Sequence, residues 1–249
     1  MNLPDARQDI LRARLERGQT VELASVASEF HVSVDTVRRD LKLLETEGVA
    51  RCVRGGAMPV ARPSGAALRR MAQSHARYEA LAARALPLIE DGMVLLLDGG
   101  ATVLALAQAL PPLPNGLVVT PAPAVALACL AAGVPTHLVG GRLSGSGAIC
   151  VGHEAVVAIA DVAADIAFLG VCGFDAGFGL SADDPDEASV KRAMGMASHR
   201  TVALTGADKL GRRARHRVLP LKEMSLLITD ASPDTLRDFT SKGLEVHRA

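Results

Sequence analysis

Residues 33–45, with the sequence Ser-Val-Asp-Thr-Val-Arg-Arg-Asp-Leu-Lys-Leu-Leu-Glu, constrain the fold of this chain more than any other stretch. Ser33 is a favourable N-cap, because its hydroxyl can accept a hydrogen bond from an unpaired backbone N–H at a helix start. Apolar side chains then follow at the spacing of one helix face: Val37, Leu41 and Leu44. The stretch therefore predicts a short amphipathic helix with one buried face.

The opposite face of this predicted helix carries charge. At the angular spacing of an α-helix, Asp35, Arg39 and Lys42 lie nearly opposite the apolar stripe, and Arg38 lies on its flank. A helix that buries one face and exposes Arg and Lys on the other suits the major groove of double-stranded DNA, where such side chains reach base edges.

A shorter helix is predicted directly before it, at 21–30, where one face carries Leu23, Val26, Ala27 and Phe30. His31-Val32 leaves only a tight turn between the two helices, which is typical of a helix-turn-helix. Residues 5–17 predict a supporting helix, ended by Gly18. Its arginines are expected on a solvated face: Arg7, Arg12 and Arg14.

A small β-wing is predicted after the charged helix. Gly48 would end that helix, residues 49–54 would form a strand, and Gly55-Gly56 would close it. Arg51 and Arg54 would then reach the DNA backbone, where contacts position a protein without reading the sequence.

These stretches closely resemble the N-terminal signature of DeoR-family bacterial transcriptional regulators. The resemblance is carried by Ser33-Val-Asp-Thr-Val-Arg-Arg-Asp-Leu41, Leu44-Glu45, Gly48 and Arg54-Gly-Gly-Ala57. It implies a winged helix-turn-helix that binds double-stranded operator DNA through the 33–45 helix. The residues expected to contact DNA are Ser33, Asp35, Thr36, Arg38, Arg39, Lys42, Arg51 and Arg54.

Composition excludes several other classes. Aromatic residues make up only 2% of the chain, which argues against a stacking platform for single-stranded nucleic acid. The formal net charge is zero, so any DNA contact must come from a local arrangement of charge. Four cysteines without a Cys-x-x-Cys pair favour reduced thiols over a disulfide framework or a zinc site. Without an apolar N-terminal segment or a bilayer-spanning run, a cytoplasmic protein without cofactor or metal is expected.

Three regions follow from these patterns: a winged helix-turn-helix at 1–57, a linker at 58–75 and a larger domain at 76–249. Residues 51–77 hold six arginines and no acidic residue, with prolines in the early part of the linker. A solvated tether and a basic arm near the DNA backbone are about equally consistent with this composition.

The third region predicts an α/β fold. Short apolar runs alternate with helix-like segments, which favours a largely parallel sheet covered by helices on both faces. The runs lie at 94–98, 116–120, 136–139, 166–170, 201–204, 226–229 and 244–247. The helix candidates lie at 77–90, 101–110, 122–132, 153–160, 186–199 and 232–242. Loops at the carboxyl ends of the strands would form a ligand site.

Individually, the motifs of this region are weak. The Gly99-Gly100 turn leads from a strand into a helix whose N-terminus could hold an anion. Gly140-Gly141 after a strand is equally weak evidence of an anion site, and Gly145-Ser-Gly147 is more typical of a flexible loop than of a phosphate cradle. Glu187 and Lys191 stand at i, i+4 and predict a surface ion pair.

In order along the chain, these motifs resemble the sensor domain of the same family. That resemblance implies a fold like ribose-5-phosphate isomerase and a small phosphorylated metabolite, such as a sugar phosphate, as effector. The expected pocket residues are Asp98, Gly100, Thr102, Thr120, Gly141, Gly173, Lys191 and Lys209. The chain departs from the family pattern at Ala101, Pro121 and Gly206, where a threonine, an asparagine and an acidic residue are usual.

The sequence therefore predicts a transcriptional regulator without catalytic residues, most simply a repressor. It would bind its operator as a homodimer or homotetramer and leave it when the metabolite binds. One alternative is a sugar-phosphate isomerase fused to a DNA-binding domain, with Asp98, Asp208 and Glu187 as candidate carboxylates. Another is an architectural DNA-binding protein whose sensor no longer binds a ligand.

Overall fold

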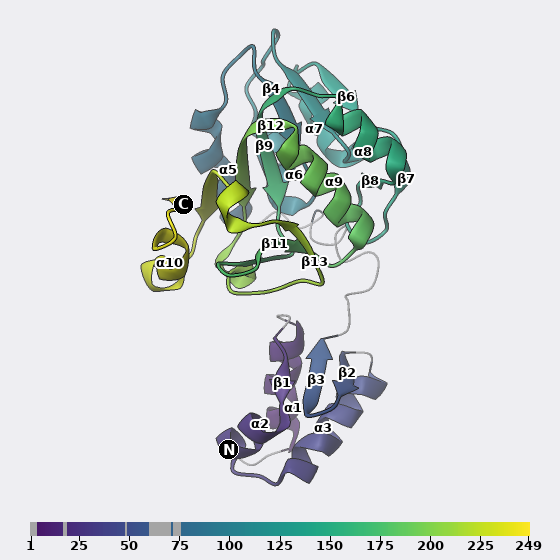
Figure 1. The fold of residues 1–249 in the computed structure, drawn as a ribbon, viewed down its shortest axis with the longest axis vertical. Helices are drawn as coiled ribbons and strands as arrows, with labels where there is room; N and C mark the ends of the chain where they lie inside the picture. The colour runs from purple at the N-terminus through teal and green to yellow at the C-terminus, as the bar shows by residue number, and fades with distance from the viewer. Residues whose placement is uncertain (1–3, 17–18, 48, 60–70, 72–75) are drawn as a thin grey trace. The chain divides into compact units, whose positions relative to one another are not determined.

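The computed structural model describes residues 4–16, 19–47, 49–59, 71 and 76–249 (Figure 1). The chain divides into two units, residues 1–62 (unit 1) and 63–249 (unit 2), each with its own hydrophobic core. Most of the predicted linker lies outside the described residues, as does Gly48. None of the described helices is both long and apolar enough to cross a membrane.

The described residues of unit 1 form three helices and a three-stranded antiparallel sheet. Its elements are α1 (Pro4–Glu16), β1 (Val21–Glu22), α2 (Leu23–Phe30), α3 (Val34–Thr46), β2 (Ala50–Val53) and β3 (Gly56–Pro59). The sheet has the strand order β1-β3-β2, and β2 and β3 form the wing. Two details differ from the sequence prediction. Val21 and Glu22 do not start a helix but pair with Ala57 and Gly56, and β3 continues two residues beyond position 57.

The predicted apolar stripe of α3 forms the core of unit 1. Val37, Leu41 and Leu44 are fully or almost fully buried, and they pack with Leu11 and Leu15 of α1. The fold of the helix-turn-helix thus follows from the apolar periodicity read along the sequence.

The predicted solvated face of α1 is wrong for Arg7, whereas Arg12 and Arg14 are partly exposed. Arg7 is buried and donates from Nε to the buried Asp40 carboxylate at 2.6 Å. Arg12 pairs with Glu47, and Arg14 pairs with Glu29. Each of these arginines therefore has an acidic partner in unit 1, and only Arg7 is removed from solvent.

Unit 2 is built around a seven-stranded sheet with the order β15-β14-β12-β9-β4-β5-β6. Its strands are β4 (Val94–Leu97), β5 (Leu117–Thr120), β6 (Thr136–Leu138), β9 (Ala164–Gly170), β12 (Ser198–Leu204), β14 (Leu226–Thr229) and β15 (Glu245–Arg248). Every pairing within it is parallel. All seven predicted apolar runs are strands of this sheet, so the predicted parallel sheet is confirmed.

Helices cover the sheet in two groups. The helices among the described residues of unit 2 are α5 (Ala76–Ala85), α6 (Ala101–Gln108), α7 (Pro123–Ala131), α8 (His153–Ala160), α9 (Pro185–Met196) and α10 (Pro233–Thr240). Short 3-10 turns lie at Leu86–Leu88, Ala207–Lys209 and Leu221–Glu223. α6 packs between α5 and α7, whereas α8 packs against α9 in front of the sheet in Figure 1. This arrangement is the one that right-handed crossovers between parallel strands produce.

Five short strands among the described residues of unit 2 were not predicted. β10 (Gly173–Asp175), β11 (Gly179–Ala182) and β13 (His216–Leu219) form a second, antiparallel sheet. β7 (Arg142–Leu143) and β8 (Cys150–Val151) form a small hairpin. None exceeds four residues, which is too short to show a periodic pattern.

Candidate DNA-reading surface and sensor site

The N-terminus of α3 is fixed by two hydroxyl groups. The Ser33 hydroxyl accepts a hydrogen bond from the Thr36 backbone N–H at 3.1 Å, and the two side-chain hydroxyls lie 2.9 Å apart. Ser33 is therefore the N-cap that the sequence predicts. Ser33 and Thr36 therefore stabilise the start of α3, independently of any contact with DNA.

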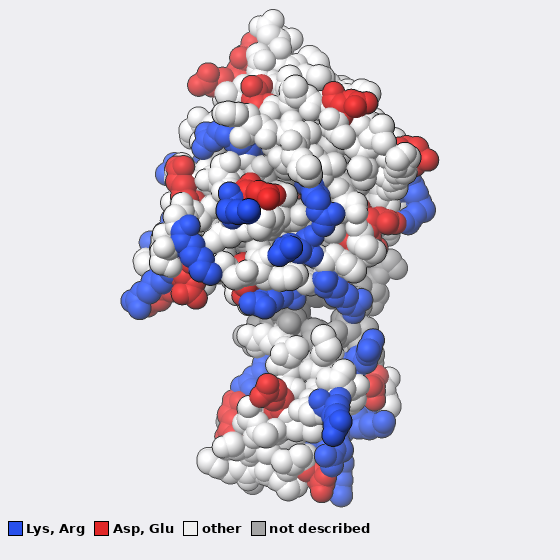
Figure 2. Space-filling model, viewed as in Figure 1, with Lys and Arg blue, Asp and Glu red and all other residues white. Residues whose placement is uncertain are grey.

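The outer face of α3 exposes Asp35, Arg38, Arg39 and Lys42. Asp35 and Arg38 form an ion pair, and Lys42 lies 3.6 Å from Glu45. Among the described residues, Arg39 has no acidic partner within salt-bridge distance, so its guanidinium is available to an outside acceptor. Figure 2 shows that Lys and Arg side chains of unit 1 gather on the side that carries α3 and the wing.

The wing is tied directly to α3. Glu45 accepts a hydrogen bond from the Cys52 backbone N–H at 2.8 Å, and this contact lowers the pKa of the Glu45 carboxyl. Arg51 on β2 and Arg54 in the β2–β3 turn are both exposed. The bond from α3 to β2 therefore fixes where these two arginines stand relative to the exposed face of α3.

In unit 2, the first of two charged clusters lies at the carboxyl ends of β4 and β9. Asp98 follows β4 and is fully buried, and its Oδ2 accepts hydrogen bonds from Lys191 Nζ and, at 2.8 Å, from the Gly170 N–H. Lys191 also donates to the Gly170 carbonyl at 3.2 Å. Burial lowers the pKa of Lys191, but the charge and hydrogen bond of Asp98, together with the charges of Cys172 and Glu187, outweigh burial and hold that pKa above its usual value. The predicted surface pair of Glu187 with Lys191 is thus wrong.

One carboxylate oxygen of this cluster accepts no hydrogen bond from the described residues. Asp98 Oδ1 is buried and has no hydrogen-bond partner among the described residues. Asp98 stands two residues before Gly100, which is the N-cap of α6 and has a φ of +100°. An unpaired buried carboxylate oxygen is costly, so its natural complement is a donor such as a hydroxyl of a bound molecule.

Glu187, at the start of α9, holds a loop in place. Its Oε1 accepts from the hydroxyls of Ser144, at 2.8 Å, and Ser146, at 2.5 Å. A Cβ added to Gly147 would lie 2.6 Å from the same oxygen, and one added to Gly99 would lie 2.3 Å from the Ile149 side chain. The loop 144–149 therefore lies against both Glu187 and the turn after β4.

A second ion cluster lies at the carboxyl ends of β12 and β14. Arg77 of α5 pairs with Asp208 at 2.8 Å and with Asp230 at 2.7 Å, and Lys209 lies 3.1 Å from Asp208. Burial raises the pKa of Asp208, but Lys209 and Arg77 lower it below its usual value. Gly206 is explained by this cluster, because a Cβ there would lie 1.8 Å from the Arg77 guanidinium.

The other expected pocket residues have different surroundings. Thr120 is fully buried, and its hydroxyl accepts from the Ala122 N–H at 3.1 Å, so it shapes its own loop. Thr102 is half-buried in the first turn of α6, and Gly141 is exposed just before β7. Gly173 is buried at the start of β10, opposite Ser181. The structure thus brings Asp98, Gly100 and Lys191 together and leaves Thr120, Gly141 and Gly173 with roles in the backbone architecture.

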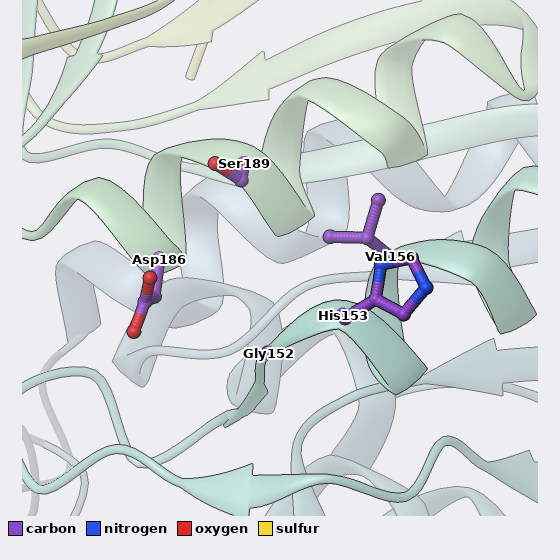
Figure 3. Close-up of a pocket in the computed structure, with 5 residues that line it drawn as sticks. All are labelled: Gly152, His153, Val156, Asp186 and Ser189. Carbon is purple, nitrogen blue, oxygen red and sulfur yellow. The ribbon is translucent and has the colours of Figure 1, made fainter.

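A separate pocket of about 240 Å³ lies at the N-terminus of α8 (Figure 3). It is lined by Gly152, His153, Val156, Asp186 and Ser189. The Asp186 carboxylate on its rim pairs with Arg142 at 2.6 Å. None of the expected effector residues lines this pocket. Within the described part of the chain, no group of three His, Cys, Asp or Glu side chains could hold a metal ion.

A winged helix-turn-helix with an exposed basic helix, followed by an α/β unit with a buried charged site, defines a DNA-binding regulator with a ligand-sensing domain. Comparison with family models agrees. The DeoR-like helix-turn-helix domain matches residues 7–61, and the DeoR C terminal sensor domain matches residues 73–231. The chain belongs to the DeoR family of transcriptional regulators. Because this is a family of regulators and not of enzymes, the isomerase alternative is wrong.

Curated relatives match over most of their length. The regulator YgbI of Escherichia coli K12 is 32% identical over 96% of this chain and 93% of its own. GlpR of Haloferax volcanii is 30% identical over 92% and 91%, and the repressor GlcR of Bacillus subtilis is 27% identical over 88% and 86%. Among solved structures, a ribose-5-phosphate isomerase with bound phospho-erythronic acid is 16% identical, covers 53% of this chain and 52% of its own, and has a TM-score of 0.39. A score this low assigns neither ligand nor activity.

Proposed function

We propose that this protein is a cytoplasmic repressor of a carbohydrate-metabolism operon, released from its operator by a phosphorylated sugar or a related metabolite. The observation that carries the sensor half is the buried, unpaired Asp98 Oδ1 beside the Lys191 ammonium. Together they offer an acceptor for a hydroxyl and a cation for an anionic group, which are the two features of a sugar phosphate. Repression is favoured by the relative GlcR, which is named as a transcriptional repressor.

The DNA-binding half rests on the exposed face of α3 and on the wing. Arg38, Arg39 and Lys42 would reach the major groove, with Asp35, Ser33 and Thr36 at the helix start beside them. Arg51 and Arg54 would contact phosphates. A single α3 presents few base contacts, so a homodimer or homotetramer would bind two half-sites of one operator.

Arg39→Ala is expected to weaken operator binding by about 1–3 kcal/mol without changing the fold, because Arg39 is exposed and has no acidic partner among the described residues. The measurement is a fluorescence-anisotropy titration at fixed salt. Arg237→Ala, which removes an equally exposed arginine from α10, is the matched control. Equal affinities of both variants and the wild type would contradict the assignment of α3 as the reader.

Effector binding must favour one arrangement of the protein over another, since equal affinity for both would shift nothing. The loop 144–149 is the element that a ligand would displace, because it lies against Glu187 and the turn that follows Asp98. We propose Asp98, Gly100, Thr102 and Lys191 as the inner contacts. Lys209 would supply a second cation from the neighbouring strand end, and Thr120, Gly141 and Gly173 would shape the surrounding loops.

Lys209→Met tests this pocket. A wild-type protein at a ligand concentration of about 100 Kd should gain roughly 2.7 kcal/mol of stability, and the variant should lose most of that gain. The measurement is thermal shift over a panel of sugar phosphates, with Lys222→Met as the control for a lost surface charge. Equal stabilisation of the variant and the wild type would contradict the assignment of Lys209 to the pocket. If no phosphorylated compound stabilises the wild type, the proposed effector class is wrong, whereas the DNA-binding proposal stands.

A further inference from the structure

A long uncharged stretch crosses one edge of unit 2. Residues 99–141 contain no Asp, Glu, Lys or Arg, although these residue types make up 22% of the chain. The stretch includes α7, whose nine residues Pro-Ala-Val-Ala-Leu-Ala-Cys-Leu-Ala carry no polar side chain other than the buried Cys129 thiol. A helix that is apolar on every side is normally covered on every side.

α7 is not covered on every side in the isolated chain. Leu127 is 69% exposed and Leu130 is 57% exposed, and Ala131 beside them is exposed as well. Leu138 of β6 is 46% exposed. α7 packs against β5 and β6, so these side chains lie on one helix and on the strand next to it. We call Leu127, Leu130, Ala131 and Leu138 the α7–β6 patch.

The patch lies at a free edge of the main sheet. β6 is the last strand in the order, and its only strand partner among the described residues is β5. Proteins normally protect such an edge with charged side chains, proline or a covering element. Residues 136–138 carry no charged Lys, Arg, Asp or Glu, so charge does not protect this edge.

We propose that the α7–β6 patch is the surface through which unit 2 binds a second copy of this chain. A two-fold contact places the same surface on both sides, and a surface without charge meets its own copy without like-charge repulsion and without burying an unpaired ion. DNA or a strongly charged protein finds no complementary charge here. A two-fold dimer also provides the paired DNA-reading helices that two half-sites require.

This inference rests on the homo-oligomer part of the proposed function and not on the effector. The test is the mass of the full-length protein by analytical ultracentrifugation across a concentration series. The double variant L127K/L130K places a charge on each side of the contact and is expected to weaken self-association at least about 100-fold. Met196→Lys, at a side chain of α9 that is 75% exposed and outside the patch, is expected to leave association unchanged.

A charge-pairing experiment separates a lost contact from a damaged fold. L127K/L130K and L127E/L130E are each expected to be folded monomers by circular dichroism, and an equimolar mixture is expected to associate again. If L127K/L130K does not fold, L127Q/L130Q replaces it with the same expected direction. A monomeric wild type would overturn both this inference and the homo-oligomer proposal. An oligomer that survives the patch substitutions, or is lost equally in Met196→Lys, would overturn the interface alone.

Discussion

Lys191→Met is expected to lower the free energy of unfolding of unit 2 by about 3–5 kcal/mol, because it leaves the Asp98 carboxylate buried without its cation. The chain has no tryptophan and a single tyrosine, Tyr78 of α5, so tyrosine fluorescence during urea unfolding follows unit 2 alone. The expected result is a transition midpoint shifted to much lower urea at an unchanged slope.

Two further variants show whether this loss comes from the unpaired charge. Asp98→Asn combined with Lys191→Met removes both charges and should recover part of the stability, since a neutral amide is cheaper to bury than a lone carboxylate. Lys222→Met removes an exposed lysine and should change the stability by less than about 0.5 kcal/mol. A Lys191→Met protein as stable as Lys222→Met would contradict the buried pair.

Arg7→Met is expected to have a similar effect in unit 1. The Arg7–Asp40 pair joins α1 to α3 inside a small core, and removal of the arginine leaves the Asp40 carboxylate buried without its cation, with only the neutral Gln8 amide still donating to it, at a cost of about 3–5 kcal/mol. Small domains have little stability to spare, so most of unit 1 should unfold near physiological temperature and DNA binding should fail with it.

The matched control for Arg7 is Arg12, on the same helix. Arg12 pairs with Glu47 near the surface, where an ion pair contributes about 0–1 kcal/mol. Thermal unfolding by far-ultraviolet circular dichroism should therefore show a large shift of the unit 1 transition for Arg7→Met and a small one for Arg12→Met. Equal shifts for the two variants would contradict a larger contribution of the buried Arg7–Asp40 pair to the stability of unit 1.

The helices and strands that form the two cores could be predicted from local sequence patterns. The Ser33 cap and the apolar stripe of α3 are set by residues within a few positions of one another, and each of the seven apolar runs forms a strand of one parallel sheet. In both cases the periodicity that determines the element is contained within the element itself, so the sequence shows it directly.

Partners far apart in the chain could not be predicted. Arg7 and Asp40 are separated by 33 positions, and Lys191 pairs with Asp98 from 93 positions away instead of with Glu187 one turn before it. From the sequence, Gly206 was visible only as a departure from the family pattern. Its reason is a distant residue: the Arg77 guanidinium of α5 fills the space that a side chain at position 206 would need. The loop 144–149 was missed for the same reason, since the carboxylate that holds it comes from α9.

The most direct test of the central claim is release of wild-type protein from its operator by a metabolite. An operator fragment selected from the source genome with the protein itself would be titrated by fluorescence anisotropy, with and without each sugar phosphate and its unphosphorylated parent. One phosphorylated compound is expected to weaken operator binding about 5–150-fold, the usual range of coupling between two sites, while its parent sugar has no effect. Operator affinity that no phosphorylated compound changes, or that the parent sugar changes equally, would contradict the account.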